Sequence, residues 1–175
     1  MNSQSLIRTA LVVLLYVSIQ VLFVRNLVLY DVAFCFVYLI AILWLPGDMD
    51  TLWVILISFL IGLIVDSFYN TGGIHAAACT LIGYLRKSIL LYFFPGKGIE
   101  NDVVVTLLGL GHQRYRYLLF VGVMVLIHHL FLFLVESGDM SLLIHSLAKV
   151  LFSTLFTAIV IYLSSVFTSN LSSQK

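Results

Sequence analysis

Blocks of apolar residues separated by short polar stretches run along the whole chain. Each block is close to the ~20 residues that a helix needs to cross the hydrocarbon core of a bilayer. The blocks cover residues 6–24, 28–45, 52–68, 74–92, 117–135 and 141–167. The pattern therefore predicts an all-α integral membrane protein with six transmembrane helices, in a single domain that comprises residues 1–175.

Turn-forming and polar residues mark the ends of these blocks. Pro46 and Gly47 end the second block, because neither residue readily continues a helix, and Asp50 or Thr51 can cap the third helix. Residues 70–73, Asn-Thr-Gly-Gly, predict the turn between the third and fourth spans. Residues 94–116 are expected to form a cytoplasmic or interfacial segment, and residues 168–175 a polar tail.

Composition supports the membrane class and narrows the partners. The chain is 62% hydrophobic and 10% charged, whereas a soluble domain carries about a quarter charged residues. The formal net charge of +1 is too small for the basic field that nucleic-acid binding needs. The predicted surroundings are thus the lipid bilayer and other membrane proteins. Cys35 and Cys79 lie inside apolar blocks and form neither a metal-binding pair nor a disulfide framework.

Lysine and arginine are unevenly distributed between the two sides of a six-span chain. If the amino terminus is cytoplasmic, only Arg25 and Lys149 lie outside. The inner side then holds Arg8, Arg86, Lys87, Lys97, Arg114, Arg116 and Lys175. The positive-inside rule therefore favours a multi-pass protein of the cytoplasmic membrane with both termini in the cytoplasm. A five-span chain, with one terminus on the other side, is the structural alternative.

Small residues recur at helical spacing on the third and fourth spans. Ser58, Gly62 and Asp66 are four residues apart, so they share one helix face. Small faces let two backbones approach closely, which is how helices associate in lipid. We therefore expect a tight hairpin. The matching face of the fourth span is made by Ala76, Thr80 and Gly83.

Asp66 is expected near the carboxyl end of its helix, where the helix dipole disfavours a negative charge. It should therefore have a partner. The candidates are the free amides around Gly72 and Gly73, where the next helix begins, and the side chain of His75. The alternative is an interfacial carboxylate that headgroup water hydrates.

Neither a metal site nor a reaction centre is predicted. His128 and His129 are adjacent, so their side chains point about 100° apart and cannot share a metal as an i, i+4 pair does. We expect one of them to pack inside and the other to hydrogen-bond a neighbouring helix. The sequence has no GxSxG, HExxH, P-loop or paired-aspartate motif, so we predict no cofactor and no enzymatic activity.

The order of motifs in this hairpin resembles the rod-shape-determining membrane protein MreD family. A Gly-Leu-x-x-Asp helix at 62–66 is followed by a glycine turn at 72–73, a Gly-x-His-Ala-Ala helix start at 73–77 and a Gly-Tyr-Leu exit at 83–85. The run that begins at His128-His129 and ends at Glu136 is also similar to the fifth span of some members. The bulkier residues 67–70 depart from the small polar turn of the family.

The resemblance implies a non-catalytic scaffold of the cell-elongation machinery. Such a protein binds an MreC-like single-span partner, and through it MreB-like filaments and RodA with a class B penicillin-binding protein, coupling the cytoskeleton to peptidoglycan synthesis. The implied fold is similar to the substrate-binding subunit of energy-coupling-factor transporters. A small-molecule-binding membrane subunit of such a transporter is therefore the alternative function.

Overall fold

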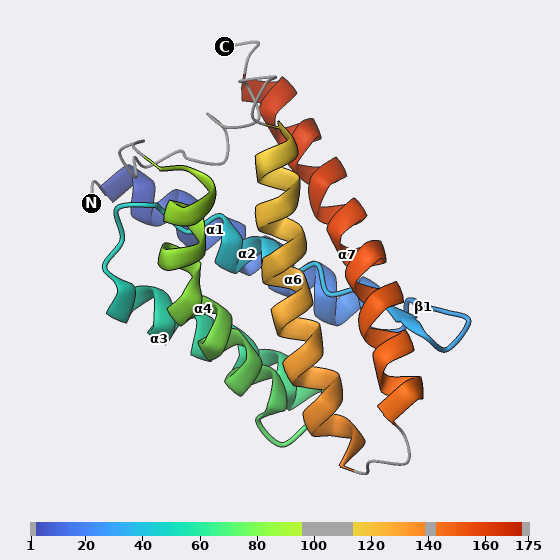
Figure 1. The fold of residues 1–175 in the computed structure, drawn as a ribbon. Helices are drawn as coiled ribbons and strands as arrows, with labels where there is room; N and C mark the ends of the chain where they lie inside the picture. Colours follow the sequence, from blue (N-terminus) through green and yellow to red (C-terminus); the bar gives the residue numbers. More distant parts are fainter. Residues whose placement is uncertain (1–2, 96–113, 139–142, 173–175) are drawn as a thin grey trace.

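The structure is a computed structural model that describes residues 3–95, 114–138 and 143–172. Figure 1 shows a bundle of long helices with a small β-hairpin at one side. The long helices are α1 (Ser3–Ile19), which the π-helical turn η1 (Gln20–Val24) extends, α3 (Thr51–Tyr69), α4 (Ile74–Phe93), α6 (Arg114–Ser137) and α7 (Leu143–Ser172). The other elements are β1 (Val28–Leu29), β2 (Ala33–Phe34) and α2 (Leu39–Leu43).

Five helical segments in the described part of the chain are long and apolar enough to cross a membrane. They are Ile7–Val24, Thr51–Tyr69, Ile74–Phe93, Arg114–Ser137 and Ile144–Thr168. Five of the six predicted spans thus coincide with helices to within a few residues. The protein is an all-α, multi-pass membrane protein.

The spanning helix predicted over residues 28–45 is absent. This segment forms the antiparallel pair of β1 and β2, an extended stretch and the five-residue helix α2, so the prediction of a long helix there is wrong. Residues 35–43 are instead buried by the other elements, with each side chain at most 5% exposed. An apolar run marks burial, and hydropathy alone does not distinguish burial in protein from burial in lipid.

Side chains from distant elements supply hydrogen bonds to this irregular backbone. The amide of Phe34 donates to Ser153 Oγ of α7 over 2.9 Å, and the amide of Phe36 donates to Thr157 Oγ1 over 3.1 Å. Gln20 of η1 bonds the same stretch through both its amide nitrogen and its amide oxygen. Non-helical backbone is tolerated at membrane depth only where protein buries and satisfies it, and the buried part of the segment, residues 35–43, meets that condition.

The predicted polar regions are partly corrected. Helix α7 continues through Ser172, so most of the predicted tail at 168–175 is helical. The hydroxyl of Thr168 donates to the carbonyl oxygen of Ser164 one turn earlier, over 2.9 Å, which satisfies this polar side chain within the helix. Helix α6 begins at Arg114, before the predicted start of the fifth span. Residues 96–113 of the predicted interfacial segment lie outside the described residues.

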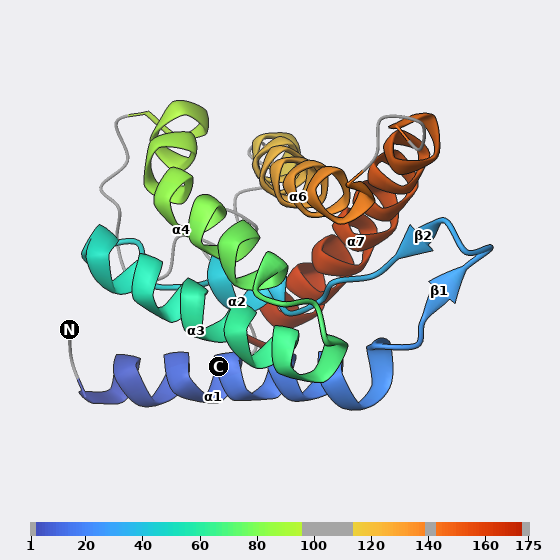
Figure 2. The same ribbon diagram turned by 90° about the horizontal axis from the view of Figure 1, so that it is seen from below.

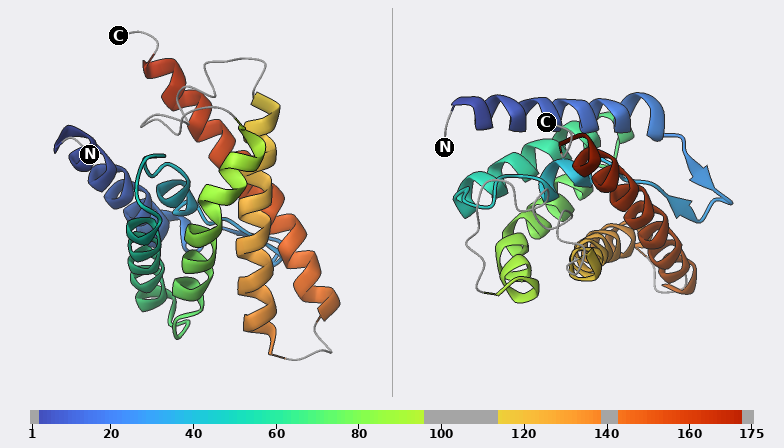
Figure 3. Two further views of the ribbon diagram at one scale, coloured as in Figure 1. Left: turned by 60° about the vertical axis from the view of Figure 1, so that its left-hand side comes forward. Right: turned by 90° about the horizontal axis from the view of Figure 1, so that it is seen from above.

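The long helices pack in sequence order around α2. Helix α3 packs against α4, α4 against α6, and α6 against α7. Helix α1 lies along one side of the bundle, with α2 between it and α6 (Figures 2 and 3). The centre of the bundle is therefore occupied by residues 35–43 of segment 28–45, while its β-hairpin lies at the side (Figure 2).

Candidate functional site

The predicted tight contact between α3 and α4 is confirmed. A Cβ atom added to Gly62 would lie 2.5 Å from Ala76 Cα and 2.6 Å from the carbonyl oxygen of His75. One added to Gly83 would lie 2.6 Å from Ser58 Oγ. Real Cβ atoms do not make contacts this short. Glycine at position 62 therefore lets the backbones of α3 and α4 lie this close, and glycine at position 83 leaves room for the Ser58 side chain.

Asp66 caps the first turn of α4 from the neighbouring helix. Its Oδ1 accepts the amide of His75 over 3.1 Å and the hydroxyl of Thr71 over 2.5 Å, and its Oδ2 accepts the amide of Ala76 over 2.8 Å. The side chain is only 5% exposed. The prediction of a partner at the start of the next helix is correct, and the hydrated alternative is wrong. The amides lie one turn beyond the predicted Gly72 and Gly73.

This arrangement satisfies the amino terminus of α4 completely. The first four amides of a helix have no partner within the helix, and the N-cap residue Gly73 has no side chain to supply one. The amide of Ile74 donates to the carbonyl oxygen of Thr71, and that of Ala77 to the carbonyl oxygen of Gly73. Asp66 accepts the two amides between them, and its charge is favourable at this end of the helix dipole.

The turn between the two helices uses three residues in left-handed conformations. Asn70 has φ +56°, Gly72 +60° and Gly73 +97°. These values suit glycine and are tolerated by asparagine. Thr80, predicted on the contact face, is half-buried and donates to the carbonyl oxygen of Ala76 in its own helix over 2.7 Å. The close contact therefore depends on glycines and Ala76 rather than on Thr80.

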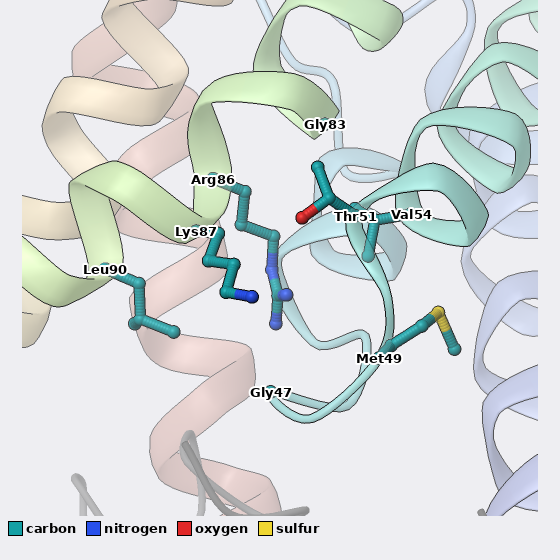
Figure 4. A pocket seen from close by; sticks show the side chains of 8 residues that line it. All are labelled: Gly47, Met49, Thr51, Val54, Gly83, Arg86, Lys87 and Leu90. Atoms are coloured by element: carbon teal, nitrogen blue, oxygen red, sulfur yellow. The ribbon is translucent and has the colours of Figure 1, made fainter. Parts of the chain in front are cut away.

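At the other end of the hairpin, the side chain of Arg86 is buried. Its guanidinium donates to the carbonyl oxygens of Leu43 and Leu45 at the end of α2. Figure 4 shows the side chain running from α4 toward the loop that carries Gly47, beside a cavity of about 10 Å³. A cation at a helix carboxyl terminus is favourable, and here it ties α4 to segment 28–45.

Tyr38, His75 and His128 meet in the centre of the bundle. Tyr38 Oη lies 2.9 Å from His75 Nδ1 and 2.8 Å from His128 Nε2. A tyrosine hydroxyl has one proton, so one histidine accepts it while the other donates a ring N–H to the tyrosine oxygen. All three side chains are at most 2% exposed. The cluster joins segment 28–45, α4 and α6, and the predicted contact between the His75 side chain and Asp66 is replaced by these bonds.

His129 is buried beside this cluster but makes a different bond. Its Nδ1 lies 2.7 Å from the carbonyl oxygen of Val125 in its own helix, and its Nε2 has no partner among the described residues. The ring of Phe36 packs against it, with centroids 5.2 Å apart. The prediction for the histidine pair agrees with this arrangement: His129 packs inside, and His128 bonds a neighbouring element, the N-cap residue of α2.

A cavity of about 60 Å³ lies next to His75. Phe36, Tyr69, Thr71 and Glu136 are among its lining residues. This volume holds a few water molecules and is well below the ~300 Å³ of clefts that bind drug-sized ligands. Water is therefore the occupant that its size suits.

Sequence reasoning missed Tyr38, Gln20 and the two α7 hydroxyls of Ser153 and Thr157. Each is a polar residue inside an apolar block, which is the signal that could have identified them. A polar group at membrane depth needs a partner. Gln20, Ser153 and Thr157 find partners in segment 28–45, and Tyr38 finds its partners on α4 and α6. Among the described residues, no group of three or more His, Cys, Asp or Glu side chains is placed to hold a metal ion.

Comparisons with protein-family models, curated proteins and solved structures find no match. The site is therefore interpreted from its own geometry. Its polar groups hydrogen-bond one another across the α3–α4 hairpin and between segment 28–45 and the helices. In the described structure these bonds hold the elements of the bundle together.

Proposed function

We propose that this protein is a non-catalytic membrane scaffold of the bacterial cell-elongation machinery. In this role it binds an MreC-like single-span protein and so couples MreB-like filaments to peptidoglycan synthesis by RodA and its penicillin-binding protein. The proposal starts from the resemblance of the hairpin motifs to the MreD family. The partners in the proposal are those that this resemblance implies.

The α3–α4 hairpin is the observation that supports the proposal. Gly62 permits close backbone contact, Gly83 leaves room for the Ser58 side chain, and Asp66 caps the next helix. The residues that form the resemblance thus serve to lock two helices together. Such a role is typical of a rigid docking element, whose exposed apolar faces include Leu60 and Leu63 of α3. Van der Waals packing on such a face can hold a partner helix in lipid.

The transporter-subunit alternative needs a site for a water-soluble ligand. The buried cluster adjoins a cavity of about 60 Å³, and residues 35–43 of segment 28–45 fill the centre of the bundle with side chains. A vitamin-sized molecule needs several times that volume. Segment 28–45 would have to move aside before such a ligand could bind at this cluster. The larger groove of about 640 Å³ between α1 and α3 is lined mainly by apolar side chains, which suits a water-soluble ligand poorly and favours the scaffold.

For topology, we infer six crossings with both termini in the cytoplasm. In this arrangement segment 28–45 makes the second crossing without a long helix. Thr9 of α1 and Asp48 line one groove, so the chain has returned by residue 48 to the end where α1 began. This course would also preserve the charge asymmetry on which the positive-inside assignment rests.

Single-cysteine labelling tests the topology. Both native cysteines are buried, so Cys35→Ala and Cys79→Ala provide the background. We expect Gly98→Cys to be protected from a membrane-impermeant thiol reagent in intact cells, whereas Ser137→Cys reacts. Labelling of both positions from outside would contradict the proposed topology.

Depletion and co-purification test the function. We expect cells that lose this protein to become wide and round, and a tagged copy to restore their shape and to retain a stoichiometric single-span partner in mild detergent. Normal cell shape on depletion, together with recovery of an ATPase pair and a tightly bound water-soluble ligand, would favour the transporter subunit instead.

A further inference from the structure

A groove of about 640 Å³ lies between α1 and α3. Ala10 and Val13 of α1 line one side, and Trp53 and Ile57 of α3 line the other. Ala10 is exposed and Trp53 is 61% exposed, so the two helices leave apolar walls uncovered here. The volume is within the ~300–1,000 Å³ range of binding clefts, so the groove is large enough to receive another apolar group.

The groove is too small for a spanning helix of another protein. A helix about 10 Å wide has a cross-section of roughly 80 Å², so a volume of about 640 Å³ holds about 8 Å of it, or five to six residues. That is less than a third of the ~30 Å that a spanning helix occupies. The groove therefore suits a short apolar segment of one to two turns.

Residues 103–110, between α4 and α6, form an apolar run of about this size. They read Val-Val-Val-Thr-Leu-Leu-Gly-Leu, with Asn101 and Asp102 before them and His112 and Gln113 after them. Eight residues are far fewer than the ~20 that cross a bilayer as a helix. Because exposing aliphatic side chains to water is unfavourable, this run needs an apolar surface within its reach.

The end of α4 brings the chain next to the groove. Leu90, in the last turn of α4, lines the cavity of about 10 Å³ shown in Figure 4. Met49 lines both that cavity and the groove. The ten-residue step from Phe93, where α4 ends, to Val103 spans up to about 33 Å when extended. The apolar run can therefore reach the groove from α4.

The start of α6 is linked to the α1 side of the groove. Tyr117 accepts a hydrogen bond from Trp44 Nε1 over 3.3 Å, and the Trp44 ring packs edge-on against Tyr16 of α1, with centroids 5.6 Å apart. Tyr16 lies three residues beyond Val13 and so is its neighbour on the helix surface. Figure 1 shows the starts of α1 and α6 and the end of α4 toward the same end of the bundle. The chain thus leaves α4 and enters α6 close to the groove.

We propose that the apolar run 103–110 docks in the groove between α1 and α3. The connections to α4 and α6 keep this occupant near its site and give it a high effective concentration. Docking covers the walls at Ala10 and Trp53 and fixes α1, which packs more against α2 than against α3, to the rest of the bundle. The inference does not depend on the scaffold function, because it uses only the groove and the chain that reaches it.

Disulfide cross-linking tests where the run lies. In the Cys35→Ala and Cys79→Ala background, Leu107→Cys is combined with either Ala10→Cys or Leu11→Cys. Leu11 is 61% exposed and lies at nearly the same height on α1, but its side chain points about 100° away from that of Ala10. We expect oxidation in native membranes to join positions 10 and 107 on the order of tenfold faster than positions 11 and 107, because docking raises the effective concentration of the first pair. Mass spectrometry of the joined peptides measures both rates.

A labelling measurement checks that the run covers the groove. In inside-out vesicles, Ala10→Cys should react slowly with a small maleimide. Adding Leu107→Asp and Leu108→Asp should speed this reaction by about threefold or more, because carboxylates are costly to bury in an apolar groove. Leu11→Cys is the control and should react at the same rate with and without the two aspartates. Circular dichroism of each variant checks that the helices are retained.

Three results would overturn the proposal. Equal rates for the two cysteine pairs would place the run along the membrane interface, outside the groove. A disulfide that forms only between two copies, at a rate that falls as the protein is diluted with lipid, would make a neighbouring copy the occupant. Protection of Ala10→Cys that survives the two aspartates would show that a lipid or another protein covers the groove. None of these results bears on the depletion phenotype, so the two proposals fail separately.

Discussion

The α3–α4 hairpin and segment 28–45 both place polar groups inside an apolar bundle, but the partners of those groups lie at different distances along the chain. Asp66 bonds amides nine and ten residues away. The amides of Phe34 and Phe36 bond hydroxyls 119 and 121 residues away. The hairpin thus supplies the hydrogen-bond partner of Asp66 itself, whereas the amides of segment 28–45 depend on a helix that reaches them only in the folded protein.

This difference has consequences for folding and for mutation. Contacts between neighbouring elements close a short loop and lose little chain entropy, while distant contacts require the rest of the bundle to be in place. We therefore expect the hairpin to be disturbed most by a change in packing, and segment 28–45 by the loss of single remote hydrogen bonds. Four substitutions, each with a matched control, test this comparison.

The largest effect is expected from Gly62→Leu. The added side chain meets the backbone of Ala76, which cannot move without separating the helices, so the free energy of unfolding should fall by about 3 kcal/mol. Unfolding in mixed micelles of mild detergent and sodium dodecyl sulfate measures it. Gly122→Leu is the control, because a Cβ there meets open space. Equal stability of the two variants would show that the close contact is not essential.

Asp66→Asn should have the next largest effect. An asparagine has one acceptor oxygen in place of two, so at least one of the amides of His75 and Ala76 loses its partner, at a cost of about 2 kcal/mol in the same unfolding assay. Asp50→Asn is the control, since Asp50 caps α3 at an exposed site and asparagine caps equally well. A larger loss for Asp66→Asn than for Gly62→Leu would mean that charge outranks packing in the hairpin.

Thr157→Val tests the remote bonds of segment 28–45. Valine keeps the shape but leaves the amide of Phe36 without its acceptor, which should cost about 1 to 2 kcal/mol. Thr154→Val, one turn earlier on α7, is the control, because the Thr154 hydroxyl is buried with no partner among the described residues. That control should be neutral or slightly stabilising. The opposite ranking would show that α7 does not support the segment through this hydroxyl.

The smallest effect is expected from Tyr38→Phe. It removes both bonds to His75 and His128, but phenylalanine fills the same space and the nearby cavity has room for water to replace a partner. The cost should be about 1 kcal/mol in the same assay. Tyr30→Phe, at a residue 96% exposed, should change nothing. A loss above about 3 kcal/mol would make the cluster the main support of the bundle centre.

Much of the hairpin could be predicted from sequence because its signals are local. The spacing of Ser58, Gly62 and Asp66 predicts one face, and the turn residues at 70–73 predict where the chain reverses. A partner for Asp66 at the start of α4 follows from the helix dipole. Which amides bond Asp66 could not be predicted. A shift of one turn between α3 and α4 changes the partner of Asp66 without changing the residue spacing on either helix.

The sequence by itself determined that this chain enters a membrane, because 62% hydrophobic residues in long blocks cannot form a soluble surface. It also determined where the five long helices begin and end to within a few residues. Only the tertiary structure decided that residues 28–45 do not form one long helix. Their hydropathy indicates only that they are buried. Whether lipid or protein buries them depends on contacts with other elements, such as the hydrogen bonds from Gln20, Ser153 and Thr157.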